Sequence, residues 1–210
     1  MIAKCRARLL GKLLCPMLLL SWLTGPARAE PVTDRDGQHL SGLSGAKGKT
    51  HAHQHQAANY GLKGLSFIEA GGDRPCRLVA IYDRLSADHL NLTNHDFPDH
   101  GCTKQTESTK TVRFSGRDEF VQGVKVCLNG KGNRIKGAEI HGARVTDSHK
   151  VVPFSETRKV VRTNCKDWKA LARCAKTEIA VGMQVHYTDA DGYRGVELMC
   201  RPLQQLDRTR

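Results

Sequence analysis

Aromatic side chains are scarce in this sequence and make up 5% of its 210 residues. Proteins that bind single-stranded nucleic acid stack the bases on aromatic rings set among basic residues. Here the basic residues are also spread along the chain, with no dense run of them. The sequence therefore argues against specific recognition of nucleic acid.

Catalytic motifs are missing as well. No Gly-x-Ser-x-Gly nucleophile elbow occurs, and no glycine-rich phosphate loop follows a strand and opens a helix. The histidines are scattered, and none is marked by its neighbours as the base of a catalytic triad. We therefore expect a non-enzymatic protein with no catalytic residue and no cofactor. A hydrolase whose active residues converge only in the folded chain is the alternative.

Motifs for metal binding are weak. No Cys-x2-Cys pair occurs, which argues against structural zinc. The stretch Asp189-Ala-Asp191-Gly192 has the composition of a calcium loop. However, Tyr187 and Leu198 stand where such a loop has its first acidic residue and its closing glutamate. We interpret this stretch as a hairpin turn and predict no metal site.

Residues 1–29 have the three parts of a secretory signal: a basic start, an apolar stretch from Leu13 to Leu23, and small residues at Ala27 and Ala29. The apolar stretch is about half of the roughly 20 residues that a membrane-spanning helix needs. We therefore expect cleavage after Ala29 and a secreted protein, periplasmic or extracellular, without a membrane span.

Cleavage would remove two of the eight cysteines and leave six. In an oxidising compartment an even number of cysteines indicates disulfides, and six cysteines allow 15 pairings. We predict that Cys174 pairs with Cys200, because these two bracket a single hairpin unit. The six remaining cysteines are Cys76, Cys102, Cys127, Cys165, Cys174 and Cys200.

Without the leader, the chain has 28 Lys and Arg against 21 Asp and Glu, a net charge of about +7. Such an excess favours anionic polymers as partners. Because the charges are evenly scattered, they are also typical of a solvated, mildly basic surface.

Residues 30–58 are polar, with repeated Gly, Ser, Lys, Gln and His and almost no aliphatic side chains. We expect a flexible arm here, because so little apolar surface cannot offset the entropy lost on ordering. Within it His51, His53 and His55 alternate with other residues. They are able to chelate a metal ion loosely, but no carboxylate or cysteine lies beside them to complete a defined site.

The most informative feature is an internal repeat. Three segments, 64–82, 123–141 and 182–200, each open with Gly, continue as an alternating strand, pass a polar turn and return on a second strand. The opening residues Gly64, Gly123 and Gly182 are equally spaced along the chain. The match extends upstream between the second and third copies, over 109–120 and 168–179.

Equal spacing of three hairpins predicts an all-β domain over residues 59–206 with pseudo-threefold symmetry, followed by a polar tail at 207–210. Alternation places Val124, Val126 and Leu128 on one face of their strand. The interval between two opening glycines has room for four strands, which favours a β-prism of Greek-key sheets. A β-trefoil is the alternative.

The stretch 174–187, closing in Arg194-Gly-Val-Glu-Leu-Met-Cys-Arg201, resembles the repeat of the vitelline-membrane outer-layer proteins. That repeat runs from a Cys, through a Gly-apolar-Gln strand, to an apolar-Cys-Arg ending. The resemblance implies a secreted, disulfide-bonded β-prism with internal threefold symmetry, similar in architecture to the jacalin-type lectins. It is strongest over 174–201 and weaker over 113–145 and 64–82.

These observations together favour a secreted binding or matrix-type protein that recognises carbohydrate or another cell-surface component. A protein–protein interaction or inhibitor module is the alternative. Sugar sites on prisms lie in the end loops and combine Asp, Asn, glycine amides and an aromatic platform. The loops that offer these groups contain Asp189, Asp191, Gly192 and Tyr193, and, at the equivalent place in the second repeat, Asn129, Lys131, Asn133 and Arg134.

Overall fold

The structure, a computed structural model, describes residues 32–55, 57–70, 74–86, 90–102 and 108–204. These residues form strands, turns and loops, so the expected all-β class is confirmed. The part of the chain described here contains no helix with the length and apolar character needed to cross a membrane. The expected leader, 1–29, and the expected tail, 207–210, lie outside it.

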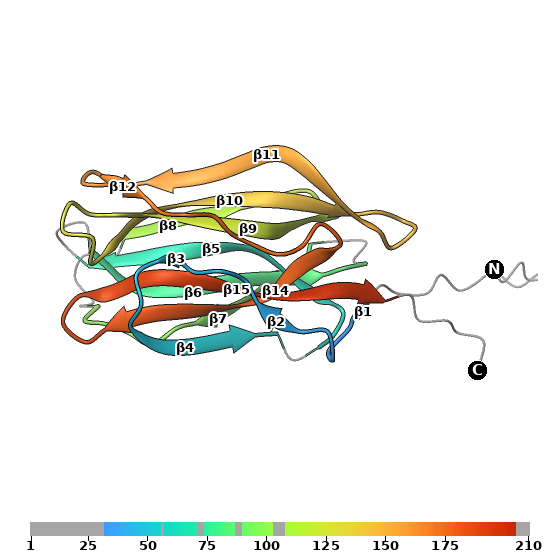
Figure 1. Ribbon diagram of the computed structural model, residues 1–210, viewed down its shortest axis with the longest axis horizontal. Coiled ribbons are helices and arrows are strands. Elements are labelled where there is room, and N and C mark those ends of the chain that lie inside the picture. The colour runs from blue at the N-terminus through green and yellow to red at the C-terminus, as the bar shows by residue number, and fades with distance from the viewer. Residues whose placement is uncertain (1–31, 56, 71–73, 87–89, 103–107, 205–210) are drawn as a thin grey trace, which may run out of the picture.

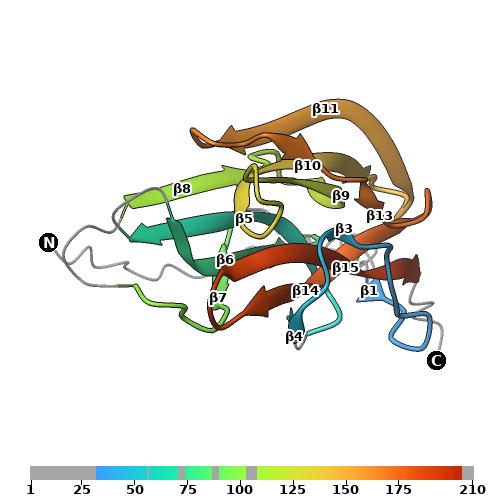
Figure 2. The same cartoon turned by 60° about the vertical axis from the view of Figure 1, so that its left-hand side comes forward.

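Three antiparallel sheets surround one core (Figures 1 and 2). The six-stranded sheet contains β1 (Val32–Thr33), β2 (His39–Leu40), β3 (Ser44–Gly45), β4 (Lys49–Gln54), β14 (Glu178–Thr188) and β15 (Gly192–Gln204). The five-stranded sheet contains β9 (Glu119–Leu128), β10 (Ile135–Val145), β11 (Val151–Val161), β12 (Asp167–Trp168) and β13 (Ala172–Arg173). The four-stranded sheet contains β5 (Tyr60–Ala70), β6 (Arg74–Arg84), β7 (Thr93–Asp96) and β8 (Ser108–Arg113).

Each predicted hairpin forms the centre of one sheet: β5 pairs with β6, β9 with β10, and β14 with β15. Side chains on the inner face of each hairpin meet in a shared apolar core, as alternation along a strand predicts. Val124, Val126, Leu128, Met183 and Val185 are fully buried there. Three sheets around one core confirm the predicted β-prism rather than the β-trefoil.

The sheets exchange strands between repeats. The strands that lead into the repeats begin at Lys49, Ser108 and Asp167, which have the same spacing as the opening glycines. β8 pairs with β5 of the preceding repeat, and β12 and β13 pair with β9. β4 pairs with β14, the first strand of the last hairpin in the chain. The first lead-in strand therefore closes the ring of three sheets.

The segment 30–58, expected to be a flexible arm, instead contains four strands in its described part, and that expectation is corrected. β1, β2, β3 and β4 pair with β14 and β15. Hydrogen bonds help to hold this segment: Ser44 Oγ accepts from Val126 N–H at 2.9 Å, and Ser41 Oγ accepts from Leu198 N–H at 2.8 Å. Composition alone does not predict that such a segment is ordered, because backbone pairing to an assembled sheet uses N–H and C=O groups that nearly every residue carries.

Matching buried side chains connect consecutive repeats. Lys63 Nζ donates to the carbonyls of the turn that precedes β9, and Gln122 Nε2 donates to those of the turn that precedes β14. The acceptors for Lys63 are Gly116 O, Arg117 O and Glu119 O; those for Gln122 are Ala175 O, Lys176 O and Glu178 O. The two donor residues, Lys63 and Gln122, are one repeat interval apart in the chain. Each acceptor carbonyl of the first set is also one repeat interval from its counterpart in the second set. The repeat therefore recurs in its internal hydrogen bonds as well as in its strands.

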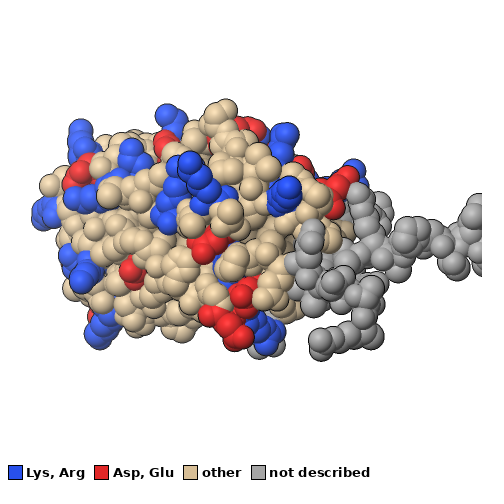
Figure 3. Space-filling view, turned by 45° about the vertical axis from the view of Figure 1, so that its right-hand side comes forward, with Lys and Arg blue, Asp and Glu red and all other residues tan. Residues whose placement is uncertain are grey.

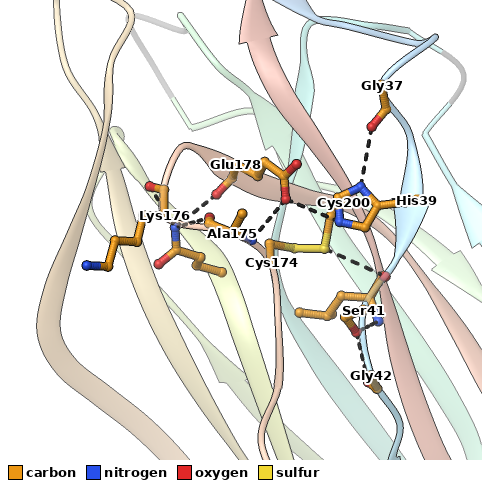
Figure 4. The surroundings of a disulfide bond; sticks show 11 residues. Gly37, His39, Ser41, Gly42, Cys174, Ala175, Lys176, Glu178 and Cys200 are labelled. Atoms are coloured by element: carbon orange, nitrogen blue, oxygen red, sulfur yellow. Dashed lines mark hydrogen bonds and ion pairs between the residues drawn. A yellow bond between two sulfur atoms is a disulfide. The ribbon is translucent and has the colours of Figure 1, made fainter.

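All six predicted cysteines form disulfides, and the predicted Cys174–Cys200 pair is confirmed (Figure 4). The other pairs are Cys76–Cys102 and Cys127–Cys165. Cys174 follows β13 of the five-stranded sheet, whereas Cys200 lies on β15 of the six-stranded sheet. This bond therefore joins two walls of the prism.

Candidate functional site

The β14–β15 loop lies at the end of the prism opposite β1 (Figure 1). Its turn is closed locally: Asp191 N–H donates to Thr188 Oγ1 at 3.1 Å, and Gly192 has a φ of 76°. Glycine adopts such a positive φ without the steric cost that other residues have. The loop therefore holds the predicted residue Asp191 in a fixed position at its tip.

The β9–β10 loop meets this tip from a different sheet. Asn133 Nδ2 donates to Asp191 Oδ1 at 2.8 Å, and Arg134 Nη2 lies 3.5 Å from the same oxygen. The Arg134 and Asp191 side chains are 33% and 28% exposed. The structure thus brings together predicted residues from the second and third repeats.

Two polar atoms of this cluster have no hydrogen-bond partner within the described residues. They are Asn133 Oδ1, an acceptor, and Arg134 Nε, a donor, and both are buried. Buried polar groups are normally paired. An unpaired acceptor and donor beside a half-buried carboxylate therefore form a set suited to a hydroxyl-bearing ligand, because each hydroxyl both donates and accepts.

Two other predicted residues have different roles. Asn129 Oδ1 accepts from the backbone N–H groups of Asn133 at 3.1 Å and Arg134 at 3.3 Å, so its side chain shapes the loop. Lys131 is exposed at the loop tip. Asn129 is therefore a positioning residue, whereas Lys131 is accessible to a ligand.

Tyr193 does not form the predicted aromatic platform. Its side chain is 1% exposed and donates its hydroxyl to Pro98 O, and burial raises its pKa. The half-buried rings of His100 and Tyr187 lie nearby, with centroids 4.5 Å apart, and His100 also contacts Tyr193. Sequence reasoning assigned neither ring to the site. His100 belongs to no repeat and reaches the site only through the tertiary fold, whereas Tyr187 lies within the third repeat but before its turn.

Asp189 lies at the same tip and pairs with Lys49, the first residue of β4. The hydrogen bond between them raises the pKa of Lys49 and lowers the pKa of Asp189. Both side chains are exposed, so the pair contributes little to stability. Asp189 therefore remains available for a ligand that displaces the lysine.

Among the described residues, two histidines lie within 3 Å of a carboxylate, as a catalytic base oriented by a carboxylate does. His186 Nε2 lies 2.8 Å from Glu197 Oε2, but this histidine is buried, and its Nδ1 accepts from Gly48 N–H at 3.4 Å. His141 Nε2 lies 2.9 Å from Glu139 Oε1, beside an open depression of about 410 Å³. The depression is lined by Lys125, Glu139, His141, Trp168, Lys169, Ala170 and Leu171, with no Ser, Thr or Cys among them. The arrangement around His141 therefore lacks the nucleophile that a triad requires.

Among the described residues, the group of three potential ligands whose ligating atoms all lie within 4.8 Å of one another is His39, Glu178 and Cys200 (Figure 4). His39 Nε2 lies 3.4 Å from Glu178 Oε2. Cys200 Sγ is bonded to Cys174 and is therefore not a thiolate, the form of cysteine that binds metals. This group is an ion pair beside a disulfide.

Charged side chains form no single dominant patch on the face drawn in Figure 3. Lys and Arg lie there as separate groups with Asp and Glu between them. The large exposed apolar side chains of the described residues are Leu40, Leu90, Val152 and Val161, and only the last two share an element, β11. Scattered apolar residues of this kind are normal on protein surfaces.

No family model matches the chain, and no curated protein matches its sequence. Solved structures resemble it in fold. Calystegia sepium agglutinin has a TM-score of 0.51 and 11% identity, over 80% of this chain and 97% of that chain. The Calsepa lectin in complex with a biantennary N-glycan has a TM-score of 0.48 and 14% identity, over 80% and 97%. The mannose-specific jacalin-related lectin from Morus nigra in complex with mannose has a TM-score of 0.40 and 13% identity, over 78% and 94%. The likeness to the agglutinin shows the fold alone, and that fold is the β-prism of the jacalin-like lectins.

Proposed function

We propose that this chain is a secreted, non-enzymatic carbohydrate-binding protein whose sugar site lies at the hairpin-loop end of the prism. The observation that carries the proposal is the contact of Asn133 and Arg134 with Asp191, which leaves an unpaired acceptor and an unpaired donor, among the described residues, beside a carboxylate. Sugars are recognised by such mixed sets, since each hydroxyl donates one hydrogen bond and accepts others.

Further features support the proposal. The half-buried rings of His100 and Tyr187 pack on one another, and His100 lies beside Gly192 of the β14–β15 loop. The chain shares its fold with an agglutinin. The three disulfides are compatible with the oxidising environment that the leader implies. Membership of the vitelline-membrane outer-layer family stays a prediction from the repeat.

The experiment is a glycan array probed at physiological and at high salt. We expect binding to a neutral glycan that survives high salt, because the site uses hydrogen bonds more than net charge. Binding only to anionic glycans that disappears with salt would show that the surface charge acts without specificity.

A pair of variants locates the site. Asp191→Ala removes the shared acceptor and releases Asn133, and we expect affinity for the best glycan to fall about tenfold or more. The matched control is Asp36→Ala, an exposed aspartate between β1 and β2, where affinity should not change. Equal affinity in both variants would refute this location.

A further inference from the structure

β4 presents a row of histidines toward the neighbouring sheet. His51 and His53 alternate along the strand, and His55 continues the same alternation just beyond it. The ring of His53 has its centroid 4.4 Å from that of His95 on β7, and the ring of His55 lies 5.5 Å from His95. Segments of two different sheets therefore bring three imidazoles together.

The surroundings fix the segment that carries these rings. Tyr82 donates its hydroxyl to His53 O at 3.0 Å, and His55 stacks on Tyr60 with ring centroids 3.5 Å apart. Phe97 packs edge-on to His53 at 5.9 Å and is itself buried. The imidazoles of His53 and His55 are thus held against an aromatic wall and are only half exposed.

The cluster contains a polar atom that this packing does not explain. His53 Nδ1 is buried and has no hydrogen-bond partner within the described residues. A buried ring nitrogen without a partner is unusual in a native protein. A metal ion is one group that satisfies such an atom, since neutral imidazole is a common ligand of Zn²⁺, Cu²⁺ and Ni²⁺.

We propose that His53 and His95 bind a divalent transition-metal ion between β4 and β7, with His55 as a third ligand. The rings of His53 and His55 lie tilted to His95 by 60° and 83°. Coordination therefore requires the rings to rotate about their side-chain torsions, and His55 must release Ala57 N–H, which donates to its Nδ1 at 3.2 Å. For this reason His55 is the weaker ligand.

A metal ion at this site would stabilise the closed ring of three sheets. β4 belongs to the six-stranded sheet and closes the ring of repeats, whereas β7 is an edge strand of the four-stranded sheet. A metal ion between them links these two walls at a place where the three disulfides do not. A ligand that binds only the folded chain raises its thermal midpoint. The inference is independent of carbohydrate binding, which uses the cluster around Asp191.

The test uses purified protein that carries no histidine tag. Zn²⁺ is titrated calorimetrically into the unaltered chain and into His53→Gln, His95→Gln, His55→Gln and the control His149→Asn. His149 lies in the β10–β11 turn with a φ of 56°, a conformation that Asn tolerates. We expect micromolar binding that weakens at least tenfold in His53→Gln and His95→Gln, less in His55→Gln, and not in His149→Asn.

Unchanged affinity in both His53→Gln and His95→Gln, or no binding to the unaltered chain, would overturn the proposal. A second measurement does not depend on the variants folding. Electron paramagnetic resonance of Cu²⁺ bound to the unaltered protein should show nitrogen couplings from at least two imidazoles, and one or none would overturn it. Zn²⁺ should also raise the thermal midpoint of the unaltered chain but not that of His95→Gln, and an equal rise in both would count against the site.

Discussion

Lys63 offers a sharp test of the link between consecutive repeats. Its side chain is fully buried, donates to three backbone carbonyls and lies 4.6 Å from the centroid of the Phe120 ring. Burial lowers its pKa from 10.5 to about 8, although Asp83 and Glu119 act in the opposite direction. In the next repeat the neutral Gln122 makes the corresponding hydrogen bonds.

Two substitutions separate the hydrogen bonds from the charge. Lys63→Gln introduces the residue that the second repeat uses, so donors to the same carbonyls remain, and we expect a change in unfolding free energy of less than about 1 kcal/mol at pH 7. Lys63→Met keeps a similar length but removes every donor. It leaves the carbonyls of the turn before β9 without their donor and should cost about 2 to 4 kcal/mol.

The dependence on pH gives the second readout. Because the folded pKa of about 8 lies below the unfolded value near 10.5, the unfolded chain binds more protons between these two pH values. Stability therefore rises with pH there, and the cost of burying the charge is fully present below pH 8. From pH 7 to pH 10 the unaltered chain should gain about 2 to 3 kcal/mol relative to Lys63→Gln.

Urea unfolding of the three proteins, followed by tryptophan fluorescence at several pH values, measures both effects. Comparison with Lys63→Gln cancels the titration of other groups. Parallel stability curves for the unaltered chain and Lys63→Gln would refute the buried-charge reasoning. Equal stability of Lys63→Met and Lys63→Gln at pH 7 would refute the role of the hydrogen bonds.

Equilibrium unfolding also tests the closure of the prism at three other places. Gly64→Ala should destabilise strongly, because a new Cβ would lie 2.2 Å from a backbone oxygen of β8, whereas Gly123→Ala should cost much less, since its nearest contact is a flexible leucine methyl at 3.1 Å. His51→Pro should cost about 2 to 3 kcal/mol, because His53 O lies against Gly182 of β14 and the backbone of His51, two residues along the strand, therefore also faces β14; no loss would support a flexible arm instead. Replacing Cys174 and Cys200 together with Ala should cost about 3 kcal/mol, and an unchanged urea midpoint would contradict this disulfide.

The candidate site was partly visible in the sequence. The repeat interval aligned the β9–β10 loop with the β14–β15 loop, and the structure joins Asn133 to Asp191 between those loops. The burial of Tyr193 was not visible, because alternation along a strand does not show whether a ring is covered by a distant loop. His100 could not be found at all, since it enters the site from outside the repeat.

The sequence by itself determined the strands of the three hairpins, their pairing and the all-β class. These features depend on local alternation and on an equal repeat spacing, both of which are properties of the chain before it folds. Only the tertiary structure decided how the ring closes. The segment 49–54 has a polar composition that predicts disorder, yet it forms β4, because β14 presents an open edge whose backbone groups need partners. That requirement arises only after the other strands have assembled, and for this reason composition did not reveal it.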